Sequence, residues 1–149
     1  MPRPLVSLAL AATLMAACTP APEGTVPSLP EGMIEAGAEQ NGGEAVIQVG
    51  QVIRIELETI PTAGYVWQID QLPGFLEHVS EATRPTDPDF QNQPGVTGGH
   101  HFMAFDLKAT EPGTGTLRLI EGRPWELEAP DSSGPDAVWT FTVTVEPAG

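Results

Sequence analysis

Hydrophobic side chains alternate with polar ones in several short segments that begin near Glu44. An alternation of period two places the apolar side chains on one face of an extended strand, so each segment predicts a strand with one buried face. A further short strand is predicted over Val46 to Val49. The apolar sets are Ile53, Ile55 and Leu57; Tyr65, Trp67 and Ile69; Met103, Phe105 and Leu107; Leu117 and Leu119; and Trp139, Phe141, Val143 and Val145.

These strands and the turns between them predict an all-β domain. About seven short strands with turn signals between them, in roughly 100 residues, are typical of an immunoglobulin-like β-sandwich. No segment has a sustained helical period, and only Leu72 to His78 suggests a single helical turn. Gly and Pro number 16 each, a content that fits a loop-rich β domain joined to a disordered stretch.

The charge balance argues against two classes of partner. Acidic residues outnumber basic ones by 20 to 6, which gives a formal net charge of -14. Nucleic acids and anionic lipid surfaces both attract Lys and Arg, so neither is expected to bind this chain electrostatically. Solubility is sufficient to explain the excess of acidic residues.

The N-terminus has the features of an export signal. Arg3 supplies a positive charge, and the apolar run from Leu5 to Ala17 is too short to cross a bilayer comfortably. The segment from Leu14 to Cys18 resembles a bacterial lipobox, which predicts cleavage before Cys18 and a lipid on its thiol. The alternative is an ordinary signal peptide with Cys18 incidental. Because Cys18 is the sole cysteine, an internal disulfide and a Cys-x-x-Cys metal site are excluded.

The chain is therefore predicted to have three parts. These are a signal peptide over residues 1–17, a lipidated cysteine and disordered tether over residues 18–43, and a β-sandwich over residues 44–149. The tether is rich in Pro, Gly, Glu and Ala, which bury too little apolar surface to offset the entropy lost on ordering. Within it, only Met33 and Ile34 suggest the start of an edge strand. We expect a lipid-anchored protein of the cell envelope. An acidic residue directly after the lipid-bearing cysteine is associated with retention in the inner membrane. Thr19 occupies that position here, so the outer membrane or periplasm is favoured.

Three loop segments carry the candidate binding residues, and the first of them is Pro61-Thr62-Ala63-Gly64-Tyr65. Pro61 fixes its own φ and keeps the preceding residue extended, while Gly64 permits a positive φ. The loop is therefore partly preorganised, which lowers the entropic cost of docking. Thr62 is expected near the tip, where its small side chain can enter a narrow cleft. A tight turn without a partner is the other interpretation.

The second and third segments are Gly95-Val96-Thr97-Gly98-Gly99 and Arg123-Pro124-Trp125. The second ends a stretch from Thr83 to Gly99 that has no strand pattern, and irregular connections of this length are often functional or disordered. Its nearly bare backbone can lie flat against a partner, unless it is simply a mobile loop. An exposed indole is costly unless something covers it, so Trp125 either folds back on the sheet or anchors a partner.

In this order the segments resemble the loops of chagasin-like inhibitors of papain-type cysteine proteases. That family carries an Asn-Pro-Thr-Thr-Gly-Tyr loop, a Gly-rich loop and an Arg-Pro-Trp loop, which match residues 60–65, 95–99 and 123–125 here. Glu58 and Trp67 also match an acidic residue and a Trp that are common in the family. The resemblance covers about residues 44–146 and implies an immunoglobulin-like fold, in agreement with the strand pattern, with the binding loops at one end.

The resemblance implies a tight, reversible inhibitor that blocks the protease cleft and is not cleaved by the protease. The first loop would enter the protease cleft beside the catalytic cysteine and histidine, with Thr62 deepest. The Gly-rich loop would cover the non-primed side, and Arg123 and Trp125 would pack on the primed side. Ile60 replaces the family Asn and Ala63 replaces its second Thr. One lost hydrogen bond is worth roughly 0.5–1.5 kcal/mol, so these departures mean weaker binding or a different target protease.

Nothing in the sequence points to catalysis, a cofactor or a metal. His100 and His101 are adjacent, so on a strand they would point to opposite faces and would not easily share a metal ion. No serine or cysteine lies in a nucleophile motif. We therefore expect a monomeric binder without enzymatic activity. The remaining alternative is an envelope lipoprotein domain whose loops bind a protein or carbohydrate and inhibit no protease.

Overall fold

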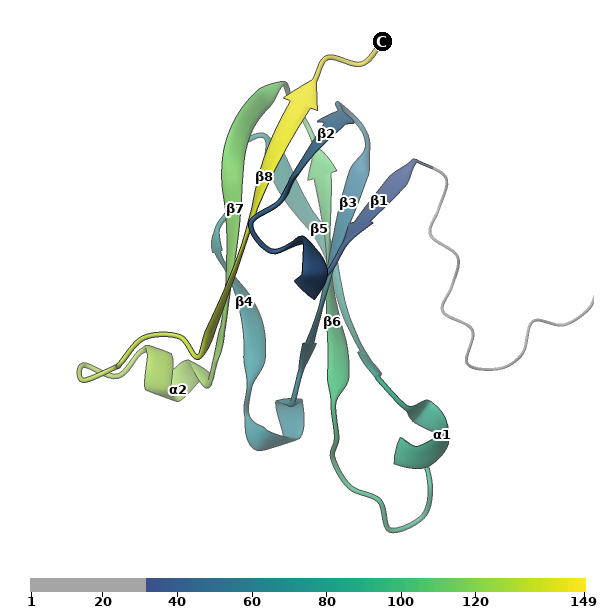
Figure 1. The fold of residues 1–149 in the computed structure, drawn as a ribbon, viewed down its shortest axis with the longest axis vertical. Helices are drawn as coiled ribbons and strands as arrows, with labels where there is room; N and C mark the ends of the chain where they lie inside the picture. Colours follow the sequence, from purple (N-terminus) through teal and green to yellow (C-terminus); the bar gives the residue numbers. More distant parts are fainter. Residues whose placement is uncertain (1–31) are drawn as a thin grey trace, which may run out of the picture.

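Two four-stranded sheets pack face to face in a computed structural model of the chain, which describes residues 32–149 (Figure 1). The eight strands of this region confirm the predicted all-β, immunoglobulin-like sandwich and are one more than expected. The first sheet has the order β1-β3-β6-β5, formed by Met33–Ala36, Val52–Thr59, His101–Ala109 and Leu76–Pro85. The second sheet has the order β2-β8-β7-β4, formed by Glu44–Gln48, Ala137–Glu146, Gly113–Gly122 and Val66–Gln71.

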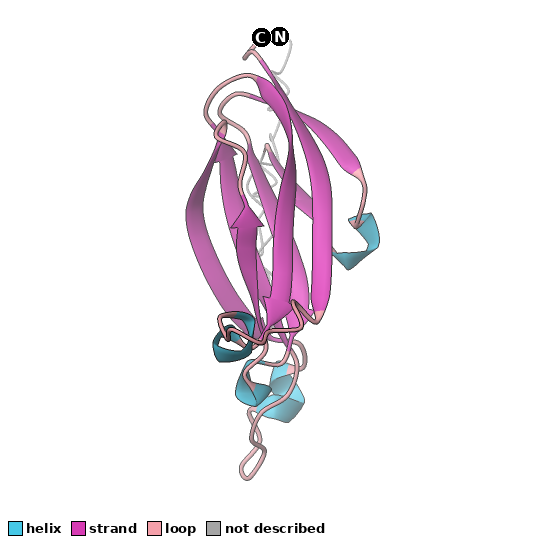
Figure 2. Ribbon diagram, turned by 90° about the vertical axis from the view of Figure 1, so that its left-hand side faces the viewer, coloured by secondary structure: helices cyan, strands magenta, loops and turns pink. Residues whose placement is uncertain are grey.

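Helix is confined to four short turns within residues 32–149, and three of them lie at one end of the sandwich (Figure 2). None of the helices in this described region is long and apolar enough to span a membrane. The turns are η1 (Ala38–Gln40), η2 (Pro61–Ala63), α1 (Pro88–Gln91) and α2 (Pro124–Leu127), of which η1 lies apart from the others.

Strand pairing brings three connections to the same end. The β3–β4 connection passes from the first sheet to the second, whereas β5–β6 lies within the first sheet and β7–β8 within the second. Thr59 at the end of β3 pairs with His101 at the start of β6, and Val66 at the start of β4 pairs with Gly122 at the end of β7. The β3–β4 connection therefore lies between the other two.

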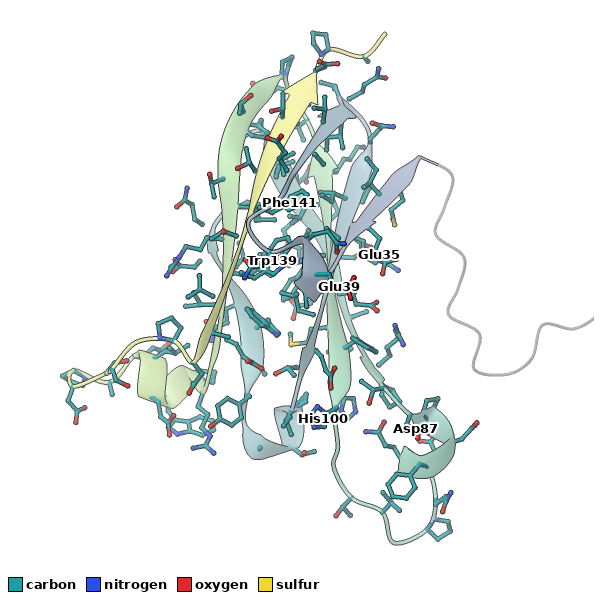
Figure 3. The ribbon with its side chains drawn as sticks, viewed as in Figure 1. Glu35, Glu39, Asp87, His100, Trp139 and Phe141 are labelled. Atoms are coloured by element: carbon teal, nitrogen blue, oxygen red, sulfur yellow. The ribbon has the colours of Figure 1, made fainter. Side chains whose placement is uncertain are left out.

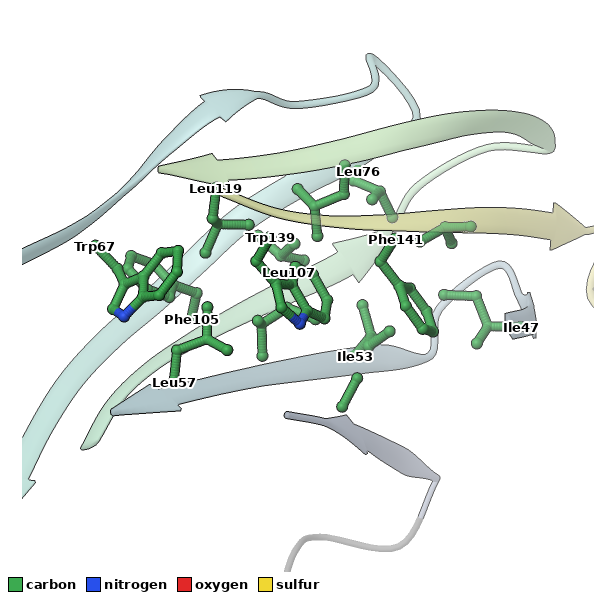
Figure 4. Packing of buried hydrophobic residues seen from close by; sticks show 14 of the residues in the cluster. Ile47, Ile53, Leu57, Trp67, Leu76, Phe105, Leu107, Leu119, Trp139 and Phe141 are labelled. Atoms are coloured by element: carbon green, nitrogen blue, oxygen red, sulfur yellow. The ribbon is translucent and has the colours of Figure 1, made fainter. Parts of the chain in front are cut away.

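The core is formed by the inward faces of the strands that the alternation predicted (Figure 4). Ile53, Ile55 and Leu57 of β3 are almost completely buried, as their period of two requires. The rings of Trp139 and Phe141 on β8 stack with their centroids 5.4 Å apart. This apolar layer holds the two sheets together and fixes the positions from which the connections leave.

The folded domain begins earlier than the predicted boundary at Glu44. β1 pairs in parallel with β3, and Ala36 is buried in the core. The indole Nε1 of Trp139 donates to the carbonyl oxygen of Gly37 at 2.9 Å. The prediction of a disordered tether is therefore wrong for residues 33–43, because pairing with β3 stabilises a segment that is short and mixed in sequence. The suggested start of an edge strand at Met33 and Ile34 is confirmed, since β1 lies at the edge of the first sheet. Residues 1–31, with the predicted signal peptide, Cys18 and the rest of the tether, lie outside the described residues.

The prediction of a helical turn over Leu72 to His78 is wrong. The prediction that no strand extends beyond Thr83 is also wrong. Leu76–Pro85 forms β5, an edge strand that pairs with β6. The pairing register shifts between His78 and Ser80. A bulge of this kind interrupts the alternation of side chains, and an edge strand exposes most of its residues, so β5 carries no clear period in the sequence.

A polar cluster fastens β3, β5 and β6 together in the first sheet. Arg54 donates to the carboxylate of Asp106 through Nε and Nη2 at 2.7 and 2.8 Å, and the Ser80 hydroxyl donates to the same carboxylate at 2.7 Å. The bonds from Arg54 and Ser80 hold the pKa of Asp106 below its ordinary value, against burial, which raises it. Asp106 is thereby kept charged although it is only 8% exposed.

Candidate functional site

The three candidate segments meet at one end of the sandwich. We call the β3–β4 connection, residues 60–65, the first loop, and residues 86–100, between β5 and β6, the glycine-rich loop. The third loop, residues 123–136, joins β7 to β8. In Figures 1 and 2 the helical turns η2, α1 and α2 of these loops lie together at the end of the molecule away from the C-terminus.

The first loop is braced by one main-chain carbonyl. Ile60 has φ of -125° and ψ of 80°, just short of the extended region, and its carbonyl oxygen accepts from the amides of Ala63 at 3.0 Å and Tyr65 at 3.2 Å. Pro61 begins the short turn η2, and Gly64 closes it at φ of 89°, a conformation that favours glycine. The turn is therefore held by its main chain, at the very place where Ile60 lacks the side-chain hydrogen bonds expected of an Asn.

A buried hydroxyl that the sequence analysis did not single out supports the base of this loop. Thr59 is only 2% exposed, and its Oγ1 lies 2.9 Å from the carbonyl oxygen of Tyr65 and 2.7 Å from a carboxylate oxygen of Glu121 on β7. The indole Nε1 of Trp67 donates to the carbonyl oxygen of Glu58 at 2.9 Å. These contacts tie both ends of the first loop to the two sheets.

The third loop packs against the first through Arg123. Its Nε donates to the carbonyl oxygen of Ala63 at 3.0 Å, and its guanidinium lies 4.6 Å from the centre of the Tyr65 ring. Nη1 donates to Glu126 at 3.0 Å, and this bond raises the pKa of Arg123. A residue predicted as a protease contact therefore also holds the first loop in place.

Trp125 lies on α2 and is 62% exposed, the largest exposed fraction among the large apolar side chains of residues 32–149. One edge of its indole lies so close to Gly64 that a Cβ at that position would overlap it. Trp125 thus neither folds into the core nor stands free. It rests on the first loop and leaves most of its surface available to a partner.

The glycine-rich loop contacts the first loop from the other side. A Cβ on Gly98 would lie 2.9 Å from the hydroxyl oxygen of Thr62, so the absence of a side chain there allows Thr62 to pack against the loop. Gly95, Gly98 and Gly99 all have positive φ. A Cβ on Gly95 would meet open space, so a side chain at this position would not touch the first loop. The first loop is the central element, since it touches both of the others.

The two adjacent histidines have different partners. Nδ1 of His100 lies 2.5 Å from a carboxylate oxygen of Glu58, and both side chains are about half exposed (Figure 3). Nδ1 of His101 lies 3.0 Å from the carbonyl oxygen of Gly99. Within residues 32–149, no group of three or more His, Cys, Asp and Glu side chains is arranged to hold a metal ion. His100 instead links the end of the glycine-rich loop to β3.

Comparisons with known proteins show which family this chain belongs to. The family described as Chagasin family peptidase inhibitor I42 matches residues 46–145. Amoebiasin-2 of Entamoeba histolytica is 32% identical over 80 residues, which cover 54% of this chain and 62% of that protein, less than two thirds of its length. Amoebiasin-1 of the same organism is 28% identical over 111 residues, or 72% of this chain and 95% of that protein.

A solved structure shares the fold. The crystal structure of the cysteine protease inhibitor EhICP2 from Entamoeba histolytica matches with a TM-score of 0.63 at 22% identity, over 76% of this chain and 96% of that chain. The family match confirms an inhibitor rather than an enzyme and gives no support to the alternative of a binding module that inhibits no protease. The chain belongs to the chagasin family of peptidase inhibitors.

Proposed function

We propose that this chain is a reversible, tight-binding inhibitor of papain-type cysteine proteases and that its three loops together block the active-site cleft. The observation that carries the proposal is the packing of the first loop between its neighbours, through Thr62 against Gly98 and Ala63 against Arg123. The three loops form one continuous surface whose shape exists before any protease binds. Preorganisation of this kind removes much of the ordering cost of association.

The first loop is the part that enters the cleft. Thr62 lies in η2 with its side chain exposed, and it is small enough for a narrow groove. Edge-docked peptides are bound as extended strands, whereas Pro61–Ala63 is a closed helical turn held by the carbonyl of Ile60. The loop therefore presents no peptide bond in the geometry of a substrate, which keeps the inhibitor intact.

The flanking loops take the two sides of the cleft. Gly95 to Gly99 has little side-chain bulk and lies along the non-primed side, while the exposed face of Trp125 packs on the primed side with Arg123 beside it. Trp, Tyr and Arg are the residues that most often dominate binding energy at protein interfaces. Trp125 is accordingly the main apolar anchor on its side.

We further propose that the inhibitor acts as a monomer, tethered through a lipid on Cys18 at the cell envelope, in the outer membrane or facing the periplasm. The lipobox-like segment ending at Cys18 supports the anchor. Met33, where β1 begins, pairs with Val52 at the start of β3, whereas the first loop follows Thr59 at its other end. The described domain thus begins at the end opposite the loops, which supports an arrangement in which the loops face away from the membrane. Mass spectrometry of the mature N-terminus checks the lipid, which Cys18→Ser should remove.

The test of the inhibitor proposal is a titration of papain and of a cathepsin L-type protease with the full-length chain. Hydrolysis of a fluorogenic peptide is followed, and the inhibitor is recovered afterwards. Sub-micromolar inhibition of either enzyme with the inhibitor uncleaved is expected. Full protease activity at tens of micromolar chain, for both enzymes, would refute the proposal.

A further inference from the structure

An exposed phenylalanine on α1 belongs to none of the three predicted segments. Phe90 is 56% exposed and contributes nothing to the hydrophobic core of residues 32–149. The other large exposed apolar side chains of this region are Val46, Leu72, Val79, Val138 and Trp125. Of the two aromatic ones, Trp125 lies on α2 and Phe90 on α1, the two helical turns that flank η2 on opposite sides (Figure 1). Phe90 is therefore placed on the binding end as a counterpart of Trp125.

The turn that carries Phe90 is held firmly at its start. Asp87, labelled in Figure 3, accepts the amide of Phe90 on its carboxylate at 3.0 Å, and its own amide donates to the side chain of Gln91 at 2.8 Å. Pro88 occupies the first helical position, where its fixed φ suits a helix. These are the contacts of a capped helix, formed within a connection of irregular structure.

The same turn is fastened to the far side of the glycine-rich loop. The side-chain amide of Gln91 donates to the carbonyl oxygen of His100 at 2.9 Å, and the amide of Thr86 donates to the same oxygen at 3.1 Å. A Cβ at Gly99 would overlap the side-chain amide of Gln91, and its φ of 120° favours glycine in any case. The backbone that carries Phe90 is thus held by several hydrogen bonds, whereas most of its side chain is exposed. An aromatic side chain held outward on an ordered support is typical of a binding residue.

We propose that Phe90 is a second aromatic binding residue, which packs against the target protease on the opposite side of the cleft from Trp125. This inference rests on the proposed function. The occupant of this surface is the wall of the protease cleft on the non-primed side, because α1 lies in the same loop as Gly95 to Gly99 and continues that surface. Phe90 requires an apolar patch on that wall, so it selects among proteases of one class.

The charges near Phe90 further define the protease surface that it would contact. Asp87 and Asp89 both precede Phe90 in the same turn and are exposed, and within residues 32–149 neither forms an ion pair. Burying the ring against a partner brings both carboxylates to the rim of the contact. The fitting surface is therefore an apolar patch bordered by lysine or arginine, which speeds association through attraction at a distance.

The experiment measures the inhibition constant of full-length Phe90→Ala against papain and a cathepsin L-type protease, with Val79→Ala as the matched control. Val79 is 47% exposed but lies at the bulge of β5, outside the loops. Phe90→Ala should weaken inhibition of at least one enzyme by about tenfold or more, with an unchanged melting temperature, while Val79→Ala leaves inhibition within twofold. Asp89→Asn should slow association at low salt and leave dissociation nearly unchanged.

The outcomes separate this inference from the proposed function. If the unaltered chain inhibits either protease and Phe90→Ala matches it within twofold on every enzyme inhibited, the second anchor is refuted and the inhibitor proposal stands. If the unaltered chain inhibits neither protease, both proposals fall. A tenfold loss for Phe90→Ala that Phe90→Leu largely restores would confirm an apolar contact.

Discussion

Nε of Arg123 donates to the main-chain carbonyl of Ala63 at 3.0 Å, across the gap between the third loop and the first. Ala63 is also the position at which the chain lacks the second threonine of the family loop, and Ile60 lacks the asparagine. The first loop therefore obtains its rigidity from its own backbone and from a neighbour rather than from its own side chains. Arg123 is a positioning residue for the loop, besides any contact that it makes with a protease.

Substitution of Arg123 tests this positioning role. Arg123→Ala removes the bond to Ala63 and the stacking on Tyr65, so inhibition should weaken by about tenfold while the melting temperature stays the same. Arg123→Lys keeps the charge but cannot form the same planar contacts, so it should be nearly as weak as alanine. Inhibition constants for the two variants show whether Arg123 acts through its planar contacts or through its charge. Full activity in Arg123→Lys would mean that only the charge matters.

Gly64 should be sensitive for two separable reasons. Gly64→Ala strains a backbone at φ of 89° and also displaces the indole of Trp125. Gly50→Ala is the matched control, because Gly50 has φ of 94°, no close neighbour, and a place in the β2–β3 turn. Both variants should lose about 1 kcal/mol of stability in chemical unfolding, and only Gly64→Ala should lose inhibition. Equal inhibition by the two variants would show that the Trp125 contact is irrelevant.

The two tryptophans on β8 and α2 should behave in opposite ways. Trp125→Ala is expected to weaken protease inhibition at least tenfold with little change in melting temperature, because the side chain is 62% exposed. Trp139→Ala should cost about 3–5 kcal/mol of unfolding free energy, because Trp139 is buried in the core. Thermal unfolding and inhibition assays on both variants provide the check. A large loss of melting temperature in Trp125→Ala would remove its role as an anchor.

Acid should weaken the fold through Asp106. Its pKa is lowered from an ordinary value of 3.8, so the charged carboxylate contributes stability that is complete above about pH 4 and is lost as the pH falls through the lowered pKa. Asp106→Asn should cost about 2 kcal/mol at pH 7, which lowers the melting temperature by about 10 °C. Asp70→Asn, at the exposed pair with Arg118, should cost less than about 1 kcal/mol.

Melting temperatures at pH 7 and pH 2 make the comparison. The difference in melting temperature between the unaltered chain and Asp106→Asn should be smaller at pH 2, because the carboxylate of Asp106 is then being protonated. An equal difference in melting temperature at pH 7 and pH 2 would show that Asp106→Asn loses stability through packing rather than through charge.

Most strands could be predicted because their alternation is local: Ile53, Ile55 and Leu57 lie two residues apart and are buried together. Only the start of β1 was suggested, by Met33 and Ile34, because that short strand depends on pairing with β3. β5 could not be predicted, because it is an exposed edge strand with a bulge. The segments of the candidate site were visible as loops. Their mutual contacts, the hydroxyl of Thr59 and the placement of Phe90 arise from tertiary packing, which no local pattern carries.

The most direct test of the central claim, that the first loop enters the protease cleft, is the inhibition constant of Thr62→Arg against papain. Thr62 is exposed in η2 and packs against Gly98, whereas the control Thr114→Arg alters an exposed threonine near the far end of β7. Inhibition by Thr62→Arg should weaken at least a hundredfold, about 2.7 kcal/mol, while inhibition by Thr114→Arg and both melting temperatures stay unchanged. Inhibition by Thr62→Arg within twofold of the unaltered chain would contradict the central claim.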